Sequence, residues 1–597
     1  MNEDQLRDLI EQVKRGKVTR RRFTSIMTGL GIAAPMATQL LAWSGLAAAQ
    51  SLPPYKPTRR GGGGSLRLLW WQAPTLLNPH FGVGQKDIDG SRIFYEPLAT
   101  WDPEANLVPI LASEIPSLQN GGVARDGLSV TWKLKRNVTW HDGKPFTADD
   151  VVFTWEYVSD PATAAVSSGV YKEVKAVEKI DPYTVRVVFV EPVPFWARPF
   201  VTSFGVIIPK HLFDAFRGAK SRDAPTNLKP VGTGPYKFVD FKPGDIVRGE
   251  INPNYHEPNR PYFDAIEMKG GGDAVSAARA VLQTAEFDYA WNVVVEDEIL
   301  KRLEQGGKGR VLFALSGRVE HMLCNFSDPW TEVDGERSNP RTRHPILSDP
   351  AVRAALNLLV DRGSIQEHVY GRGGTATRNF LNNPARFRSP NTKWEFSIAK
   401  ANQTLDAAGW KSGADGIRAR DGKKLKLLFQ TSINAPRQKS QQIIKQACQK
   451  AGIDLELKSI MASVYFSSDV GNPDTNTKFY ADLEMFNIGS GPDPWFLMNQ
   501  FYSGEIASKE NKWQGRNLSR WRNDEYDKAY MAAKGELDLA KRVALFIRMN
   551  ELVIDNHVAI PLVSTPEVGA VSNRLRMTLS GWDSHVAFLK DWYRADV

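Results

Sequence analysis

The chain has 597 residues, of which 42% are hydrophobic and 24% charged, and its formal net charge at pH 7 is +9. This composition excludes a disordered or membrane-embedded chain, and the length predicts two or three lobes rather than a single core. Acidic and basic residues are interspersed along the chain, so we expect no nucleic-acid partner.

Residues 1–49 are typical of an export signal and do not belong to the fold. Residues 19–24, Thr-Arg-Arg-Arg-Phe-Thr, resemble a twin-arginine motif, and an apolar stretch follows over residues 26–43. An anchoring helix is the alternative, but the stretch is short for a transmembrane helix of about 20 apolar residues. No cysteine lies near the expected cleavage site after Ala49, which argues against a lipid anchor. We expect a free periplasmic protein exported by the twin-arginine machinery.

The chain contains only two cysteines, Cys324 and Cys448. Two cysteines do not make a disulfide framework. An oxidising compartment would permit one bridge, but free cysteine is among the most buried residue types, which favours two separate buried thiols.

The first residues after the signal, 50–64, contain prolines and a run of four glycines and are typical of a flexible leader. The glycine run lacks the lysine and Ser/Thr of a phosphate-binding loop, which excludes a nucleotide site there. Residues 65–71 form the first predicted strand.

Residues 128–157 combine a strand, a tight turn and a capped helix. Val130, Trp132 and Leu134 alternate with polar residues, which predicts a strand with one buried face. Thr147 precedes Asp150 by three residues, the spacing of a capping box at a helix start. On physical grounds alone this is an ordinary α/β unit, and such units are scaffold more often than site.

The amino-acid sequence of this unit, WKLKRNVTWHDGKPFTADDVVFTW, resembles the signature of the family 5 extracytoplasmic solute-binding proteins. Four more segments resemble the same family in the expected order: 92–114, 231–245, 252–269 and 348–362. The resemblance implies a periplasmic receptor for a dipeptide-, oligopeptide- or nickel-type ABC importer. Its partners would be a small solute and the inner-membrane permease.

The implied fold is a two-lobed, hinged α/β binding protein of type II (cluster C-like) with an inserted β-rich domain, and we expect a monomer. The residue pattern over 424–459, strand, helix and strand, independently predicts parallel strands. The expected domains are the signal peptide 1–49, the leader 50–64, lobe I over 65–105, 231–322 and 561–597, the inserted domain 106–230 and lobe II over 323–560.

The resemblance also implies which loops face the ligand cleft: the loop after the first strand, the end of the strand near residue 290, and the loop 486–501. Such residues are as often core or edge packing as ligand contacts. We expect the ligand to contact Trp71, His80, Trp291, Asn292, Ser490, Asp493 and Trp495.

One departure bears on the ligand. Peptide receptors of this family bind the α-amino group with an aspartate three residues before an Asp-Pro pair, and here Ser490 precedes the pair Asp493-Pro494. A hydrogen bond to a charged group is worth about 1.5–3 kcal/mol, and serine does not supply the charge. Either Asp493 takes this role or the ligand has no free α-amine. Two classes therefore stay open, a peptide or peptide-like solute and an oligosaccharide or opine-type solute.

An exported enzyme is the main alternative from another class. The sequence contains no H-E-x-x-H, no G-x-S-x-G and no zinc-type cluster of Cys and His. His141-Asp142 lies in the turn of the signature and is interpreted as structural. Nine histidines without a cluster do not favour a nickel site. We therefore expect no catalytic residue, cofactor or metal, whereas a chaperone-like protein would lack a closed cleft.

Overall fold

The computed structural model describes Phe23 and residues 55–82, 84–466, 471–489, 491–511, 513 and 515–594. The predicted export signal, apart from Phe23, lies outside these described residues, as does Ser490. None of the helices in the described ranges has the length and apolar character needed to cross a bilayer.

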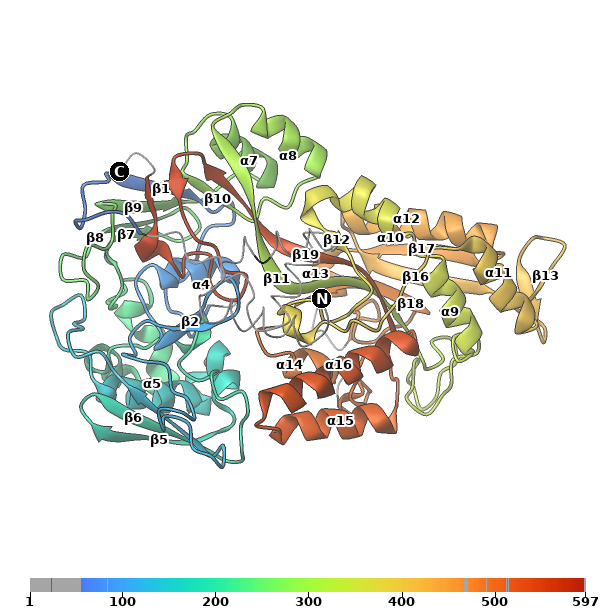
Figure 1. The fold of residues 1–597 in the computed structure, drawn as a ribbon, viewed down its shortest axis with the longest axis horizontal. Helices are drawn as coiled ribbons and strands as arrows, with labels where there is room; N and C mark the ends of the chain where they lie inside the picture. The colour runs from blue at the N-terminus through green and yellow to red at the C-terminus, as the bar shows by residue number, and fades with distance from the viewer. Residues whose placement is uncertain are drawn as a thin grey trace.

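One mixed sheet of eleven strands runs through both lobes (Figure 1). Its lobe I part consists of β10 (Tyr289–Trp291), β1 (Ser65–Leu69), β9 (Ala265–Lys269), β8 (Ile246–Ile251) and β7 (Tyr236–Lys242). Its lobe II part consists of β17 (Asp454–Ile460), β16 (Lys426–Ser432) and β18 (Leu483–Ile488). Two long strands, β11 (Gly309–Cys324) and β19 (Ala559–Ser572), join the two parts, and the short β12 (Thr375–Ala376) pairs with β19.

The predicted strands of lobe II are parallel, as expected from the strand–helix–strand pattern. β16 pairs in parallel with β17 over seven residues and with β18 on its other side. Helix α12 (Ala435–Lys450) forms the crossover between β16 and β17, and Asn434 caps its first turn by accepting from the Arg437 N–H. The parallel α/β architecture predicted for this lobe is confirmed.

The crossover between the lobes lies inside β11 and β19 rather than in a loop. Residues 309–314 of β11 pair with residues 567–572 of β19, and residues 318–323 pair with residues 559–565. The ladder is interrupted between Ala314 and Arg318, and its register shifts again between Glu320 and His321. The proposed lobe boundary at residue 322 therefore falls within a continuous strand, shortly after Arg318.

The segment proposed as the inserted domain carries a separate three-stranded antiparallel sheet, β4 (Ser129–Lys133), β6 (Thr184–Phe189) and β5 (Val174–Asp181). The predicted capping box opens α5 (Ala148–Ser159), since Thr147 Oγ1 accepts from the Asp149 N–H and Asp150 accepts from the Thr147 N–H.

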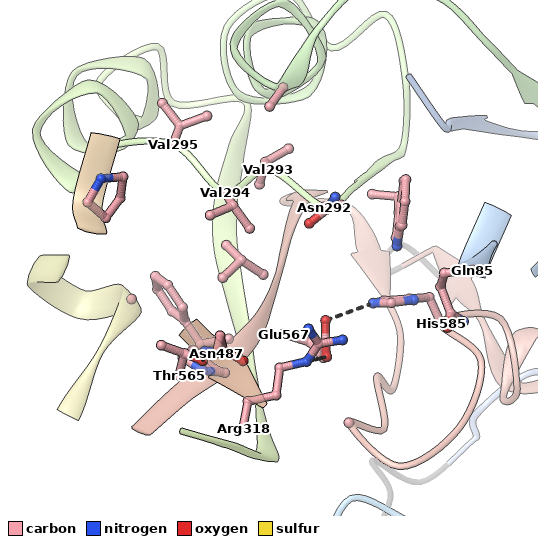
Figure 2. A pocket seen from close by; sticks show the side chains of 18 of the residues that line it. Gln85, Asn292, Val293, Val294, Val295, Arg318, Asn487, Thr565, Glu567 and His585 are labelled. Atoms are coloured by element: carbon pink, nitrogen blue, oxygen red, sulfur yellow. Dashed lines mark hydrogen bonds and ion pairs between the residues drawn. The ribbon is translucent and has the colours of Figure 1, made fainter. Parts of the chain in front are cut away.

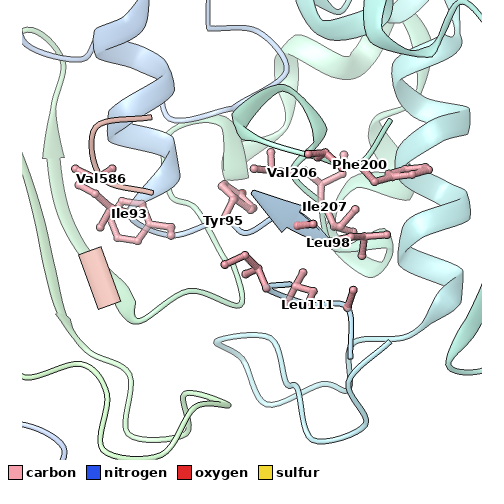
Figure 3. Packing of buried hydrophobic residues seen from close by; sticks show 14 of the residues in the cluster. Ile93, Tyr95, Leu98, Leu111, Phe200, Val206, Ile207 and Val586 are labelled. Atoms are coloured by element: carbon pink, nitrogen blue, oxygen red, sulfur yellow. The ribbon is translucent and has the colours of Figure 1, made fainter. Parts of the chain in front are cut away.

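The hydrophobic core of this segment is continuous with that of lobe I. Figure 3 shows Leu111, Phe200 and Val206 packed with Ile93 and with Val586 from the C-terminal return. Gly232 of the GTGPY turn lies directly against the Phe94 carbonyl, where a Cβ atom would overlap it. A shared core leaves no plane along which the segment and lobe I could slide, so we expect them to move as one body.

Lobe II has a separate core on each face of its sheet. One core packs α9 (Pro350–Leu358), α11 (Ile398–Ala407) and α12 on the sheet, and the other packs α15 (Asp524–Gly535) and α16 (Leu539–Asp555). Cys324 and Cys448 both lie in the first core as free thiols, in agreement with the favoured prediction. Burial raises the pKa of Cys324 to about 12, so this thiol is unreactive at neutral pH.

A buried acid in lobe II makes the stability of this lobe depend on pH. Glu484 on β18 is fully buried, and its Oε1 accepts a hydrogen bond from Gln430 Nε2 (2.6 Å). Its Oε2 has no hydrogen-bond partner within the described residues. Burial raises the pKa of Glu484 well above its usual value, and the Gln430 hydrogen bond and the nearby Arg520 offset this only in part.

We predict that Glu484→Gln stabilises the protein at neutral and alkaline pH. A carboxyl whose pKa is raised by folding does not lower the free energy of unfolding at pH values below its unfolded pKa. As the pH rises from there toward the folded pKa, it lowers that free energy progressively more. Glutamine keeps the oxygen that accepts from Gln430 but never ionises. Thermal unfolding at pH 8 should show that the variant's free energy of unfolding exceeds that of the wild type by roughly 1–3 kcal/mol. This difference should vanish at pH 4.

The matched control is Glu456→Gln, because Glu456 lies in the same sheet, on β17, with an exposed side chain. It should leave unfolding unchanged at both pH values. A gain for Glu484→Gln that is equal at pH 4 and pH 8 would contradict the ionisation argument.

Candidate functional site

A cavity of about 900 Å³ lies between the lobes beside the crossing of β11 and β19 (Figure 2). Its size falls within the range of small-molecule sites. Lobe I lines it with Trp71, Gln85, residues 291–297 and residues 581–585, lobe II with residues 369–370, 434–437 and Asn487, and the crossing strands with Arg318, Glu320 and residues 565–568. A solute held there would touch both lobes at once.

The lobe I wall of the cavity is aromatic. β1 and β10 pair in parallel, so their carboxyl ends open at the same edge of the sheet, and Trp71 and Trp291 lie at these ends. The Trp291 ring stacks on Trp70 (centroids 6.1 Å apart) and on Trp71 (6.2 Å). The Trp291 Nε1–H is buried and has no acceptor among the described residues. The wall can therefore cover a flat apolar group.

Asn292 follows at the same edge in a left-handed conformation, with φ = 53°. Asparagine tolerates this region better than most residues. Its backbone carbonyl accepts from Trp71 Nε1 (3.3 Å), and its side chain points into the cavity in Figure 2. Within the described residues the amide makes no hydrogen bond to protein, so it is free to donate to and accept from a solute.

The floor of the cavity is a row of alternating charges that crosses the hinge. His585 lies between Asp89 (Nδ1–Oδ2 3.3 Å) and Glu567 (Nε2–Oε2 3.6 Å), and Arg318 Nε lies 2.7 Å from Glu567 Oε1. Burial opposes protonation of His585, but the two carboxylates outweigh it and raise its pKa to about 9. Burial also opposes ionisation of Glu567, but His585 and Arg318 lower its pKa to about 2. His585 and Glu567 are thus both charged at neutral pH.

A second ion pair lies on the lobe II side. Glu320 on β11 is buried and pairs with Arg437 in the first turn of α12 (Oε1–Nε 2.8 Å). Arg437 also donates to Ser432 Oγ (2.7 Å). Both charges are satisfied within the protein, so this pair shapes the wall without leaving a free charge for a solute.

The structure brings together three of the predicted ligand contacts, Trp71, Trp291 and Asn292. His80 is fully buried away from this cavity, with Nδ1 2.7 Å from Ser167 Oγ. Its loop turns into the core because Asn78 bonds both the His80 N–H and Asn227. A ligand role for these residues remains a prediction, and the geometry does not favour it for His80.

Asp493 and Trp495 line a separate, smaller cavity of about 200 Å³ between the inserted segment and lobe II. Asp493 is buried in an ion pair with Arg542 of α16, and Trp495 stacks on Tyr530 of α15 (5.3 Å). Asp493 is therefore not free to bind an α-amino group in place of the missing carboxylate. Ser490 lies outside the described residues.

Sequence reasoning missed the charged floor and the lobe II wall. Asn434 and Arg437 had a usable signal, because loops at the carboxyl ends of parallel strands form ligand crevices in α/β sheets. Arg318, Glu567 and His585 had none, since they lie within or after long strands and meet only through their pairing.

Ion pairs close the rim of the cavity. Arg372, in the turn η9 (Gly371–Gly373) of lobe II, pairs with Asp297 (Nε–Oδ1 2.7 Å) and Glu304 (Nη2–Oε2 2.7 Å) of helix α8 (Asp297–Glu304) in lobe I. Gly371 has φ = 51°, and a Cβ atom there would overlap Asp297. Beside the smaller cavity, Lys534 pairs with Glu191 of the inserted segment (2.7 Å). Ion pairs thus join the two lobes at two places.

Two lobes joined by crossing strands, with a cavity lined by both, define a hinged solute-binding receptor. The family of bacterial extracellular solute-binding proteins, family 5, matches residues 106–509, and the chain belongs to this family. It is the substrate-binding component of an ABC importer and acts outside the cytoplasm.

Its relatives share the whole fold at low identity. The chain is 28% identical over 527 residues to the oligopeptide-binding protein AppA of Bacillus subtilis, covering 87% of this chain and 89% of AppA. The solved structure of that AppA with a nonapeptide covers 90% of this chain and 100% of its own, with TM-score 0.65 and 24% identity. NikZ of Campylobacter jejuni with Ni(L-His) covers 89% and 99%, with TM-score 0.68 and 22% identity. Within the described part of this chain, no three His, Cys, Asp or Glu side chains are grouped to hold a metal ion.

We predict that Arg372→Gln shifts the ligand-free protein toward an open conformation, because it removes the charge that pairs with Asp297 and Glu304 across the rim. Small-angle X-ray scattering should give a larger radius of gyration than for the wild type. Raising the salt concentration should move the wild type in the same direction, since these pairs are partly exposed and screened.

The control is Arg378→Gln in the same lobe, because within the described part of the chain the Arg378 side chain donates only a long hydrogen bond, to the Pro390 carbonyl (3.5 Å). It should scatter as the wild type does. Identical profiles for Arg372→Gln and wild type would show that the rim pairs do not hold the lobes.

Proposed function

We propose that the imported solute is a peptide or a peptide-like molecule, held between the lobes in the cavity described above. One observation carries this proposal: both lobes line a single cavity of about 900 Å³ that combines an aromatic wall with the unpaired amide of Asn292. The Asn292 amide both donates and accepts, as a peptide group requires. The names of relatives support the same class, since they include an oligopeptide-binding protein and a glutathione-binding protein.

Capture works by closure of the lobes. A solute that touches both walls binds the closed form better than the open form, and it shifts the equilibrium only by that difference in affinity. Closure buries the solute away from water, and the permease then recognises the closed receptor. The protein binds its solute without changing it, has no enzymatic activity and acts as a monomer.

An oligosaccharide or opine-type solute is the second candidate. The stacked rings of Trp71 and Trp291 suit a sugar face as well as an apolar side chain. Asp493 is occupied by Arg542, so no carboxylate of the loop 491–496 is free for an α-amino group. Both facts favour a solute that lacks a free amine, which includes N-blocked peptides.

The decisive measurement is thermal unfolding of residues 50–597 against free-amine peptides, N-acetylated peptides, oligosaccharides, opines and nickel chelates. A solute at 100 times its Kd should stabilise the protein by about 2.7 kcal/mol. For the solute found, we predict that Trp291→Ala weakens binding about 30-fold or more, as expected for a buried aromatic contact worth 2 kcal/mol.

The control for this variant is Trp394→Ala, which removes a half-exposed tryptophan outside the cavity and should leave the affinity unchanged. Stabilisation by sugars or opines and not by any peptide would replace the first proposal by the second. Loss of affinity in both variants alike would remove Trp291 from the site.

We further propose export by the twin-arginine route into the periplasm without a lipid anchor. The double variant Arg20→Lys/Arg21→Lys should leave the protein uncleaved in the cytoplasm, because lysine does not reproduce the arginine pair of the motif. Cell fractionation and immunoblotting measure this, with Arg15→Lys, outside the motif, as the control. Normal export of the double variant would indicate another route.

A further inference from the structure

Arg318 presents the only cation of the cavity floor that is open to the cavity. It lies on β11 just after the irregular step in the ladder, and 53% of its side chain is exposed. Figure 2 shows the guanidinium beside Glu567. Among the described residues, Glu567 is the only carboxylate that pairs with this side chain. A guanidinium carries five N–H donors, so most of its hydrogen-bonding capacity is left for a solute.

The charge of Glu567 is shared between two cations, because its carboxylate pairs with His585 on the side away from Arg318. The charges of the row alternate in sign from the interior of lobe I outward, in the order Asp89, His585, Glu567 and Arg318. The member that faces the cavity is a cation. Asp89 is held in place by Trp70 Nε1 (3.0 Å). The row therefore fixes Arg318 in position and presents its positive end to the solute.

The carboxylates that line the cavity are each engaged by the protein. Glu320 pairs with Arg437, and across the rim Glu296 pairs with Lys439 and Asp297 with Arg372. The two others are held by hydrogen bonds, since Asp583 accepts from the Ser203 and Ser584 N–H groups and Asp273 caps helix α7 (Ala274–Leu282). The open charge on the floor is thus cationic, whereas no carboxylate of the described lining is left without a partner for a solute ammonium.

We propose that Arg318 is a specificity-determining residue that binds a carboxylate of the solute at the hinge end of the cleft. This inference rests on the proposed function and narrows its substrate class to peptide-like solutes with a free carboxylate and no requirement for a free α-amine. The planar guanidinium matches a carboxylate through two parallel N–H···O bonds. Closure removes water from Arg318, so a solute without an anion there leaves a desolvated charge unpaired.

The test uses four synthetic tripeptide pools, with a free or acetylated N-terminus combined with a free or amidated C-terminus, and native mass spectrometry of residues 50–597. Pools with a free carboxylate should bind, and amidation should weaken binding about 10- to 150-fold, the loss of a hydrogen bond to a charged group. Acetylation should change binding little. Equal binding of acids and amides by the wild type overturns the inference but leaves the proposed function intact.

Arg318→Gln should bind acids and amides alike, and Arg318→Lys should keep part of the preference, because lysine retains the charge but not the planar fork. The matched control is Arg310→Gln, since Arg310 lies on the same strand β11 in the lobe I half and does not line the cavity. It should keep the full preference for acids. A purely structural role for Arg318 would lower the unfolding temperature and leave the acid-to-amide ratio unchanged.

The wild-type comparison needs no variant, so the inference stays testable even if Arg318→Gln does not fold. Binding of none of the four pools, together with binding of sugars, would overturn the peptide proposal and this inference with it. Retention of the acid preference in folded Arg318→Gln would overturn the inference alone.

Discussion

The antiparallel pairing of β11 with β19 is the constraint on which the rest of this molecule depends. Both strands pass from one lobe to the other, so the two lobes are joined by a hydrogen-bonded ladder rather than by flexible linkers. Backbone groups in a ladder are costly to leave unpaired, and bending is therefore easiest at the irregular steps, above all between Ala314 and Arg318, where the pairing is already broken. The cavity lies beside this step, because that is where the walls of the two lobes diverge.

The same pairing explains why the charged floor can exist. Arg318 pairs with Thr565 across the ladder, which brings its side chain to Glu567 on the same strand, and His585 reaches Glu567 from the C-terminal return of lobe I. A lone buried charge would be expensive, but alternating charges compensate one another. The floor is thus built from groups of lobe I and of the two crossing strands, and its outermost member, Arg318, is the most exposed of the four.

Closure also involves groups that never touch the solute. Arg372 reaches across the rim to α8, and Gly371 permits the close approach because it has no side chain. Because these pairs are partly exposed, each contributes little alone. Weak ion pairs at the rim leave the receptor responsive to its solute. Strong ion pairs would hold the empty form closed and lower the difference in affinity between closed and open forms on which capture depends.

Much of the fold could be predicted from the sequence, because local patterns carry it. The capping box at Thr147 and the parallel strands on either side of α12 follow from residue spacing alone, and the signature motif indicated the family that the comparison confirms. Trp71, Trp291 and Asn292 were expected at the cavity because the family resemblance implied that their loops face the cleft. The capping box and the parallel strands depend on contacts within a strand, a turn or a neighbouring strand.

Tertiary structure alone decided which polar groups are free. Asp493 carries the same charge in the sequence whether it is exposed or buried, and only the approach of α16 shows that Arg542 has already neutralised it. His80 likewise lies on a loop expected at the cleft, yet Asn78 and Asn227 draw that loop into the core. Arg318 gave no signal, because its role depends on Glu567 and His585, which approach it only after both long strands have paired. A residue's identity determines the charge it carries, but its partners, which lie far away in the chain, determine whether that charge is available to a solute.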